Sequence, residues 1–345
     1  MSAKGFDLVC PVPLGRHRTI QLAHGGGGRL TRELVEGLFL PAFDSGPLRE
    51  RHDSAVLVVG GSRLAFTTDS YVVEPRFFPG GDIGKLAVFG TVNDLCMAGA
   101  LPLYLSAGFI LEEGLPIDEL HRIVASMRAA AEVCGVELVT GDTKVVDRGK
   151  GDGLFVNTAG LGLVAEGVAV SPKRIRPGDV VLLSGDVGRH GIAVLSVRKG
   201  LSFETPIESD CASLAPLVAA LLAASVDVHC MRDATRGGLA TALNELALDA
   251  GVNIDVEERS IPVSDGVAGA CELLGLDPLY VACEGRMVVV VAEVDASRAL
   301  ETLGAGAARV GTVGLGPAGM VSLKTRMGSS RLLDLLSGEQ LPRIC

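Results

Sequence analysis

Short apolar runs of strand length alternate with helix-length stretches along most of the sequence, and this alternation restricts the folds that the chain can adopt. In the first half, helical stretches at 84–98 and 118–134 lie among apolar runs at 54–59, 63–68, 101–112, 136–140 and 154–164. The second half repeats the pattern from residue 180 onward. Such alternation is typical of α/β or α+β domains, in which helices pack against a sheet. The sequence therefore predicts a mixed α/β fold in both halves.

A polar segment with two prolines, residues 171–179, separates the halves. A single core would be oversized for 345 residues, so we expect two domains that meet near this segment. We expect an N-terminal arm at 1–23, a first domain at 24–170, a second domain at 171–325 and a mobile tail at 326–345. The tail is polar, contains Gly328 and Gly338, and ends in Cys345.

Charge and cysteine content argue against several classes of protein. The net charge is −10 and no cluster of lysine and arginine stands out, which argues against electrostatic binding of nucleic acid. No apolar run reaches the ~18 residues of a transmembrane helix, and no signal peptide is evident, so we expect a cytoplasmic protein. None of the eight cysteines forms a CxxC pair, which argues against a zinc site or a disulfide scaffold.

Four aspartates lie at the ends of apolar runs or in the turns beside them: Asp53, Asp69, Asp94 and Asp142. Any one of them alone is more often a helix cap or a turn residue. Several carboxylates that meet at one sheet edge repel each other unless a cation lies among them, and Mg²⁺ prefers carboxylate and phosphate oxygens. The set therefore predicts a magnesium site, with Lys144 supplying positive charge two residues after Asp142.

A run of four glycines, Gly25, Gly26, Gly27 and Gly28, leads into an expected helical stretch at 30–37. Glycines at such a place can present backbone N–H groups to a phosphate. A flexible linker is the common alternative, and no GxxxxGK[ST] sequence of a Walker loop occurs.

Several segments together resemble one family. They are HGGGGRLTREL, TTDSYVVEPRFFPGGDIGKLAVFGTVNDLCMAGA, FILEEGLP, TGDTKVVDRG, RDATRGGLATALNE, CELLGLD and the terminal PRIC. In order and spacing, from about His24 to Cys345, they are similar to the HypE family of hydrogenase maturation factors, within the PurM-like (AIR synthetase) superfamily. Selenophosphate synthetase and thiamine-phosphate kinase share the aspartates of this superfamily but not the PRIC end.

The resemblance implies a two-domain PurM-like α/β fold whose N-terminal domains pair into a homodimer through their sheets. It also implies ATP and Mg²⁺ in the cleft between the domains. The residues that it assigns to ATP are the four glycines together with Asp69, Asn93, Asp94, Asp142 and Thr143. Those assigned to the metal are Asp53, Asp69, Asp94 and Asp142.

The activity implied is that of a carbamoyl dehydratase. The carbamoyltransferase HypF loads a carbamoyl group on the thiol of Cys345, and ATP then activates the carbamoyl oxygen. Phosphate departs and leaves a thiocyanate, whose cyanide passes to iron held by the HypC–HypD complex. Glu284 is the candidate base that removes the nitrogen protons, and Lys144 the candidate point charge beside the phosphates. An exposed turn residue and a surface lysine are the alternative interpretations of these two.

Three positions depart from the family pattern: Cys283 replaces an asparagine, Arg286 a lysine, and Gly26 a serine. His190 and Asp233 lie in turns that open helices. His190 points into the cleft, caps its helix or packs in the core, and Asp233 shapes the same cleft or caps the following helix. A phosphotransferase acting on a small metabolite and a non-catalytic scaffold for HypC–HypD are the rival functions. The PRIC end argues against the first, and the retained Asp, Lys and Glu residues argue against the second.

Overall fold

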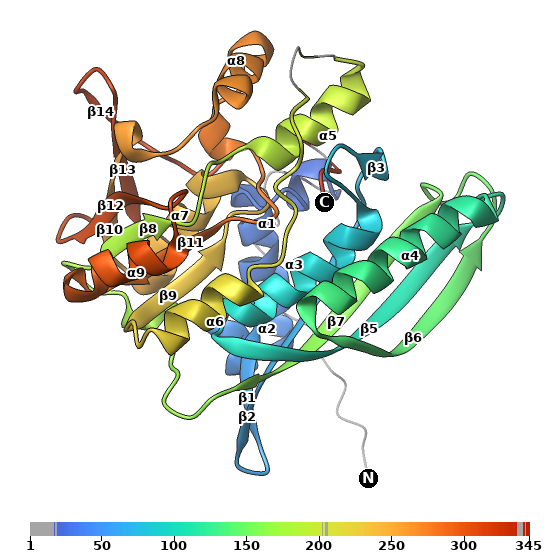
Figure 1. Cartoon of the computed structure of the whole chain (residues 1–345), viewed down its shortest axis with the longest axis horizontal. Helices are drawn as coiled ribbons and strands as arrows, with labels where there is room; N and C mark the ends of the chain where they lie inside the picture. Colours follow the sequence, from blue (N-terminus) through green and yellow to red (C-terminus); the bar gives the residue numbers. More distant parts are fainter. Residues whose placement is uncertain (1–16, 18, 202, 204–205, 337–340, 342) are drawn as a thin grey trace, which may run out of the picture.

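The computed structural model describes residues 17, 19–201, 203, 206–336, 341 and 343–345. Most of the expected arm, residues 1–16 and 18, and part of the expected tail, including Gly338, lie outside this range. Two sheets form the two halves, with helices packed on them (Figure 1). The mixture of helices and strands expected from the alternating sequence pattern is confirmed.

The first sheet has five strands in the order β1-β2-β7-β5-β6. β1 (Ala55–Val59) and β2 (Ser62–Tyr71) form the expected hairpin around two glycines, both with positive φ angles that favour glycine. β7 (Leu154–Val164) and β5 (Ala100–Glu112) continue the sheet with antiparallel neighbours, and β6 (Glu137–Val146) pairs with β5 in parallel at the edge.

Two helices, α3 (Ile83–Met97) and α4 (Ile117–Cys134), cover the inner face of this sheet. Asp82 caps α3, because its Oδ1 accepts hydrogen bonds from the backbone N–H groups of Gly84 and Lys85. Almost all of α3 is buried, because its other side packs against the second half. The outer face of the sheet, in contrast, exposes apolar side chains, namely Leu57, Phe66, Leu101, Tyr104, Ile110 and Leu163.

The second sheet has seven strands. Their order is β14 (Ser330–Leu332), β13 (Met320–Lys324), β10 (Asn253–Glu257), β12 (Ala308–Gly314), β8 (Val180–Leu183), β11 (Met287–Val291) and β9 (Val228–Asp233). The helices of this half are α5 (Arg189–Lys199), α6 (Ala215–Ala223), α7 (Gly238–Ala250), α8 (Asp265–Leu274) and α9 (Ala296–Leu303). β9 was not expected from the sequence, since VHCMRD lacks a clear apolar alternation.

Shorter elements complete the chain. In place of a single helix at 30–37, the structure has α1 (Arg29–Leu34), the π-helical turn η2 (Val35–Phe39) and α2 (Leu40–Phe43). β3 (Phe77–Phe78) pairs with β4 (Gly81–Asp82). Short 3-10 turns lie at Leu22–His24, Pro47–Glu50, Pro172–Arg174, Glu258–Ser260, Pro278–Tyr280 and Glu293–Asp295.

The expected tail does two different things. Its first part forms β14, at the edge of the second sheet, whereas the last residues return to the junction of the two halves, where Figure 1 marks the C-terminus between α5 and β3. The predicted mobility and the predicted domain limits stay predictions. None of the described helices has the length and apolar character needed to cross a membrane.

Candidate functional site

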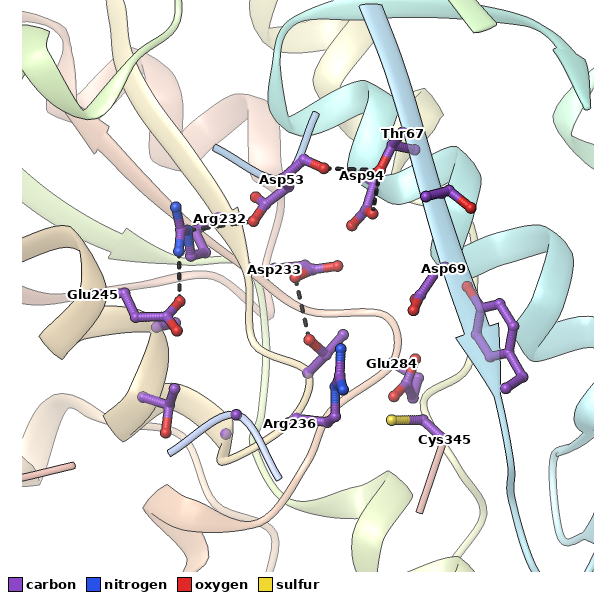
Figure 2. Close-up of a pocket in the computed structure, with 18 residues that line it drawn as sticks. Asp53, Thr67, Asp69, Asp94, Arg232, Asp233, Arg236, Glu245, Glu284 and Cys345 are labelled. Carbon is purple, nitrogen blue, oxygen red and sulfur yellow. Dashed lines mark hydrogen bonds and ion pairs between the residues drawn. The ribbon is translucent and has the colours of Figure 1, made fainter. Parts of the chain in front are cut away.

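A cavity of about 220 Å³ lies at the junction of the two halves. Six acidic side chains line it, together with two arginines and the last cysteine: Asp53, Asp69, Asp94, Asp233, Glu245, Glu284, Arg232, Arg236 and Cys345 (Figure 2). Both halves contribute, so the cavity exists only when they pack together. Three of the four aspartates expected at a metal site are present here, and the fourth is not.

The acidic residues reach the cavity from different elements. Asp69 lies on the inner face of β2, Asp53 just before β1, and Asp233 at the end of β9. Asp94 lies on α3, within the helical stretch expected at 84–98, and not at the end of a strand. Its Oδ2 lies 2.9 Å from the hydroxyl of Thr67, which lies at the same distance from the backbone carbonyl oxygen of Asp53, so the single hydroxyl hydrogen is shared between these two acceptors.

Burial and mutual repulsion shift the acidity of these groups. Burial raises the pKa of Asp94 well above its usual range, and the charges of Asp233, Asp69 and Asp53 raise it further. The pKa of Asp233 is raised in the same way, by burial and then by Asp53. A cation placed among these carboxylates would relieve the repulsion.

Two arginines supply only part of that positive charge. Nε of Arg232 lies 3.4 Å from Oδ1 of Asp53, and the same guanidinium pairs with Glu245. The other carboxylate oxygen of Asp53 is buried without a hydrogen-bond partner in the described structure. Arg236 enters from the turn before α7 and donates a 2.9 Å hydrogen bond to the carbonyl of Gly25. Sequence reasoning missed both arginines, because each reaches the cavity only through contacts distant in sequence.

Glu284 is buried, with only 3% of its surface exposed, so its interpretation as an exposed turn residue was wrong. Both carboxylate oxygens of Asp210 hold its turn, at 3.3 Å from the backbone nitrogens of Glu284 and Gly285. The Oε1 atom of Glu284 has no hydrogen-bond partner among the described residues. Burial, followed by the charges of Asp233 and Asp210, raises the pKa of Glu284 well above its usual range.

Cys345 lies inside the cavity, with its sulfur beside Glu284 and near Arg236 (Figure 2). Burial and the neighbouring charge of Glu284 raise the pKa of its thiol well above the usual value, while Arg236 acts in the opposite direction. The thiol is therefore protonated at neutral pH. In this inserted position the thiol is a poor nucleophile.

Asp142 and Lys144 do not join the cavity. Asp142 lies in the middle of β6, not at a strand end, and on the outer face of the sheet, whereas Asp69 faces inward. Three strand spacings separate their strands, a distance of about 14 Å. Both side chains are 70% exposed, and they pair with each other at 2.6 Å. Within one chain, the expectation that Asp142 shares a metal ion with Asp69 is therefore wrong.

Asn93 also has a different role from the one expected. Its Nδ2 donates to the carbonyl of Ala212 at 3.0 Å, and its Oδ1 accepts from the backbone nitrogen of Leu214 at 2.7 Å. The side chain is buried and joins α3 to the second half, so it is not free to bind a nucleotide. Thr143, on β6, does not line the cavity either.

The four glycines pack closely on the second half. Gly27 lines the main cavity with a positive φ angle of 76°, and a Cβ atom there would lie 3.0 Å from Cβ of Arg236. A Cβ atom on Gly28 would lie 2.5 Å from the carbonyl oxygen of Leu336. Close backbone approach therefore requires these two glycines. Gly26 borders a smaller space beside Leu341 and Ile344.

The remaining candidates are placed as follows. Cys283 is buried beneath the turn of Gly188 and accepts its N–H at 3.2 Å, and Arg286 pairs with Asp186 at 2.7 Å. Asp233 faces the cavity rather than capping α7. His190 is buried on α5 and contacts the end of the chain.

The donor set suits a hard cation, since it consists of carboxylate oxygens. Among the residues that the structure describes, no three acidic, histidine or cysteine side chains form a group able to hold a metal ion. Mg²⁺ commonly binds through one or two carboxylates together with phosphate oxygens and water. The site therefore fits Mg²⁺ in the company of a phosphate-bearing ligand, not as a resident ion held by protein alone.

Family models match both halves of the chain. Residues 51–164 match the AIR synthase related protein, N-terminal domain, and residues 176–324 match the C-terminal domain. The chain is 52% identical to the carbamoyl dehydratase HypE of Azotobacter vinelandii, over 96% of this chain and 98% of the relative. It is 46% identical to the carbamoyl dehydratase HypE of Escherichia coli K12, over 94% and 99%.

Solved structures give the same result. A HypE–HypF complex matches with a TM-score of 0.83 and 46% identity, over 88% of this chain and 99% of that one. HypE in complex with ATP matches with a TM-score of 0.80 and 49% identity, over 95% and 100%. A thiamine monophosphate kinase from Aquifex aeolicus, at 18% identity and a TM-score of 0.67 over 88% and 99%, shares the fold alone.

The raised pKa of Asp94 predicts an effect on stability. A buried carboxyl whose folded pKa is raised contributes stability at low pH and loses it as the pH rises through the folded value. Asp94→Asn keeps an oxygen for the hydroxyl of Thr67 but carries no charge. We expect it to raise the melting temperature by a few degrees at pH 8 and less at pH 5. The control in thermal unfolding is Asp147→Asn, at an exposed position. A lower melting temperature for Asp94→Asn than for wild type at pH 8 would show that the charge of Asp94 does not destabilise the fold.

Proposed function

The chain belongs to the HypE family of carbamoyl dehydratases within the AIR synthase related proteins, and from this premise we propose how its junction cavity works. Membership confirms the two-domain PurM-like α/β fold expected from the sequence. The protein is an ATP-dependent hydrogenase maturation enzyme that dehydrates a carbamoyl group to a cyanide precursor. The observation that carries the mechanism is the thiol of Cys345 beside Glu284 and Arg236 within the acidic cavity.

The reaction on Cys345 balances as follows. The thiol carries a carbamoyl group, S–C(=O)–NH₂, and the carbamoyl oxygen attacks the γ-phosphorus of ATP, releasing ADP. Loss of one nitrogen proton gives S–C(–O–phosphate)=NH. Loss of the second proton, with cleavage of the C–O bond, gives S–C≡N and inorganic phosphate. The protein must therefore accept protons from nitrogen and neutralise charge on oxygen.

Glu284 accepts those protons in our proposal. Its carboxylate is buried, and Oε1 is not engaged by another described residue, so it remains available to a nitrogen on the neighbouring sulfur. The raised pKa makes its carboxylate a stronger base than an exposed glutamate, nearer to the neutral range in which a general base works best. Asp210 orients it through the backbone of the same turn.

Arg236 supplies positive charge on the other side of the thiol. Its guanidinium is held by the carbonyl of Gly25, which restricts its position beside Cys345. A fixed cation there stabilises charge that develops on the carbamoyl oxygen during phosphorylation. From the sequence, Lys144 was the candidate for this role. Within one chain, Arg236 is the cationic residue that lies beside Cys345.

ATP, which a solved relative binds, has room in two adjoining cavities. The junction cavity shares Gly27, Asp53, Thr67, Thr68, Arg232 and Glu245 with a larger one of about 480 Å³. We place the phosphates near the glycine loop, Asp69 and Asp94, and the remainder of the nucleotide in the larger cavity. Asp53, Asp69, Asp94 and Asp233 are the residues that would hold Mg²⁺ together with phosphate oxygens, and the ion would supply positive charge to the transferred phosphoryl group.

The partners follow from the chemistry. A relative forms a complex with HypF, and we propose HypF as the carbamoyl donor and HypC–HypD as the acceptor of cyanide. A cytoplasmic location stays a prediction from the sequence. If the protein were instead a phosphotransferase for a small metabolite, the thiol of Cys345 in the cavity would have no role in the reaction.

We propose a homodimer through the outer face of the first sheet. That face exposes the apolar side chains named above, and its edge strand β6 has unpaired backbone groups, an arrangement that a partner normally covers. Asp142 and Lys144 lie on this face. A second copy packed there explains how residues of the GDTK segment can serve a cavity that they cannot reach in their own chain.

The role of Cys345 gives a direct prediction. After incubation with HypF, carbamoyl phosphate and ATP, the C-terminal peptide should gain about 25 Da, because S–C≡N replaces S–H at the sulfur that forms the thiocyanate. Cys345→Ala should abolish the product while ATP binding and the melting temperature persist. Mass spectrometry after proteolysis checks both, and the same mass gain on any other cysteine would assign the carrier elsewhere.

Glu284 predicts a pH dependence of dehydration. A base acts when it is deprotonated, and a raised pKa moves the loss of activity to higher pH than for an ordinary carboxylate. Single-turnover formation of thiocyanate from carbamoylated protein should therefore decline on acidification while ATP remains bound. Glu284→Gln should be slower by about 10²–10⁴ and nearly flat with pH, and wild-type rates for this variant would remove Glu284 from the mechanism.

The proposed dimer predicts complementation between inactive chains. Lys144→Ala keeps its own thiol, and Cys345→Ala keeps its own lysine. If Lys144 serves the partner's cavity, unfolding and refolding the two variants together should restore up to about a quarter of wild-type activity, since half the dimers are mixed and each has one complete site.

The mixture should be compared with each variant refolded alone, and its mass should be measured by light scattering. A dimer that shows no recovery would mean that Lys144 acts within its own chain or not at all. A monomer under all conditions would contradict the dimer itself.

A further inference from the structure

The last residues of the chain are held by their backbone. The N–H of Val72 donates to the carbonyl of Cys345 at 3.2 Å, and the N–H of Glu74 donates to the carbonyl of Arg343 at 3.1 Å. The two pairs run in opposite directions along the chain, so the tail forms a short antiparallel pairing with the residues after β2. Arg198 adds a 2.6 Å hydrogen bond to the carbonyl of Arg343.

The carbonyl between them, that of Ile344, points to the other side and accepts from His190. The distance from Nε2 of His190 to this oxygen is 2.8 Å. The imidazole is fully buried on α5, where the ring of Phe78 packs edge-on against it at 5.2 Å between centroids. The side chain of Ile344 is also buried, so the contact lies in a dry environment.

The two hydrogen bonds of the ring define its tautomer. The carbonyl oxygen of Ile344 can only accept, so the proton of the neutral ring lies on Nε2, facing the tail. Nδ1 then accepts the hydroxyl hydrogen of Ser209 at 2.8 Å, while the hydroxyl oxygen accepts the N–H of Cys211 at 3.0 Å. Burial lowers the pKa of His190 and so favours this neutral form.

We propose that His190 is a positioning residue that holds the tail in the dehydration position, and that Ser209 supports the required tautomer by donating to Nδ1. This proposal rests on the proposed function, because a carrier thiol must leave the cavity to be loaded and return to be dehydrated. The hydrogen bonds from Val72, Glu74, His190 and Arg198 go to main-chain carbonyls of the tail, and the side chain of Arg343 adds an ion pair to Asp152 at 2.9 Å. None of these contacts involves the sulfur. The same contacts therefore hold the tail whether the thiol is free or carbamoylated.

The contact with His190 shifts the equilibrium between a tail inserted in the cavity and a tail withdrawn from it. When the tail withdraws, the contact between His190 and Ile344 is lost, and the buried carbonyl and ring N–H must find water instead. Removing the donor weakens only the inserted state, so a larger fraction of molecules exposes Cys345. Loading by the carbamoyltransferase needs the exposed thiol, whereas dehydration needs the inserted one.

The decisive experiment measures exposure of Cys345 without any catalysis. The protein alone is treated with iodoacetamide, and alkylation of the C-terminal peptide is followed by mass spectrometry. Relative to wild type, His190→Leu should alkylate roughly ten times faster, since loss of a buried hydrogen bond commonly changes an equilibrium by about this factor. His190→Gln, whose amide can still donate, should remain near wild type. His121→Leu, an exposed histidine on α4, is the matched control.

Catalysis gives a second readout. In His190→Leu, HypF should load the thiol at least as fast as in wild type, while thiocyanate formation from loaded protein slows. Ser209→Ala, which frees the tautomer but keeps the imidazole, should move both alkylation and dehydration in the same directions by less. If His190→Leu does not fold, this second variant carries the test.

Unchanged alkylation in folded His190→Leu, or in Ser209→Ala where the first does not fold, would overturn the proposal. Slower dehydration with unchanged alkylation would also overturn it, because His190 would then act on the chemistry and not on the tail. If no thiocyanate forms even in wild type, the proposed function fails, yet the alkylation result still decides whether His190 holds the tail.

Discussion

The structure depends on an excess of buried negative charge where its two halves meet. Each half contributes carboxylates that it could leave in water if it stood alone, and their packing together removes that water. Arg232 and Arg236 offset part of the repulsion, and the rest appears as raised pKa values of Asp94, Asp233 and Glu284. A site of this kind favours ligands that bring cations, keeps a nearby thiol protonated, and gives a glutamate the basicity that its reaction needs.

Helix α3 makes the junction possible because it belongs to the core of both halves. One side packs on the inner face of the first sheet, and the other contacts β9 and α6 of the second half. Neighbouring residues on this helix point about 100° apart, so Asp94 faces the cavity while Asn93 binds the backbone of the second half. Adjacent polar residues on one helix thus have separate tasks, one in the site and one in holding the domains together.

The sequence was sufficient for the alternation of elements and for the acidic character of the site, since these follow from local patterns. It misplaced Asp142, because the predicted strand ended too early and a residue inside a strand faces one side of the sheet only. Asp233 and Arg236 could be placed only with β9, whose pairing with β11 is distant in sequence and leaves little local signal. The position of the chain end likewise depends on hydrogen bonds from the backbone of residues 72 and 74, and a pattern of side chains in the sequence does not reveal such backbone contacts.

The chain end pairs in an antiparallel manner with residues 72–74. The register of this pairing determines where the sulfur of Cys345 lies. The carbonyls of Arg343 and Cys345 are bound by residues 74 and 72, and that of Ile344 by His190, so a slip of one residue would move the thiol away from Glu284. The residues just before the cysteine contribute by type as well, because Arg343 pairs with Asp152 at 2.9 Å and the side chain of Ile344 is buried. Cys345 is itself paired with Val72, so this pairing determines how far the reactive sulfur lies from its base.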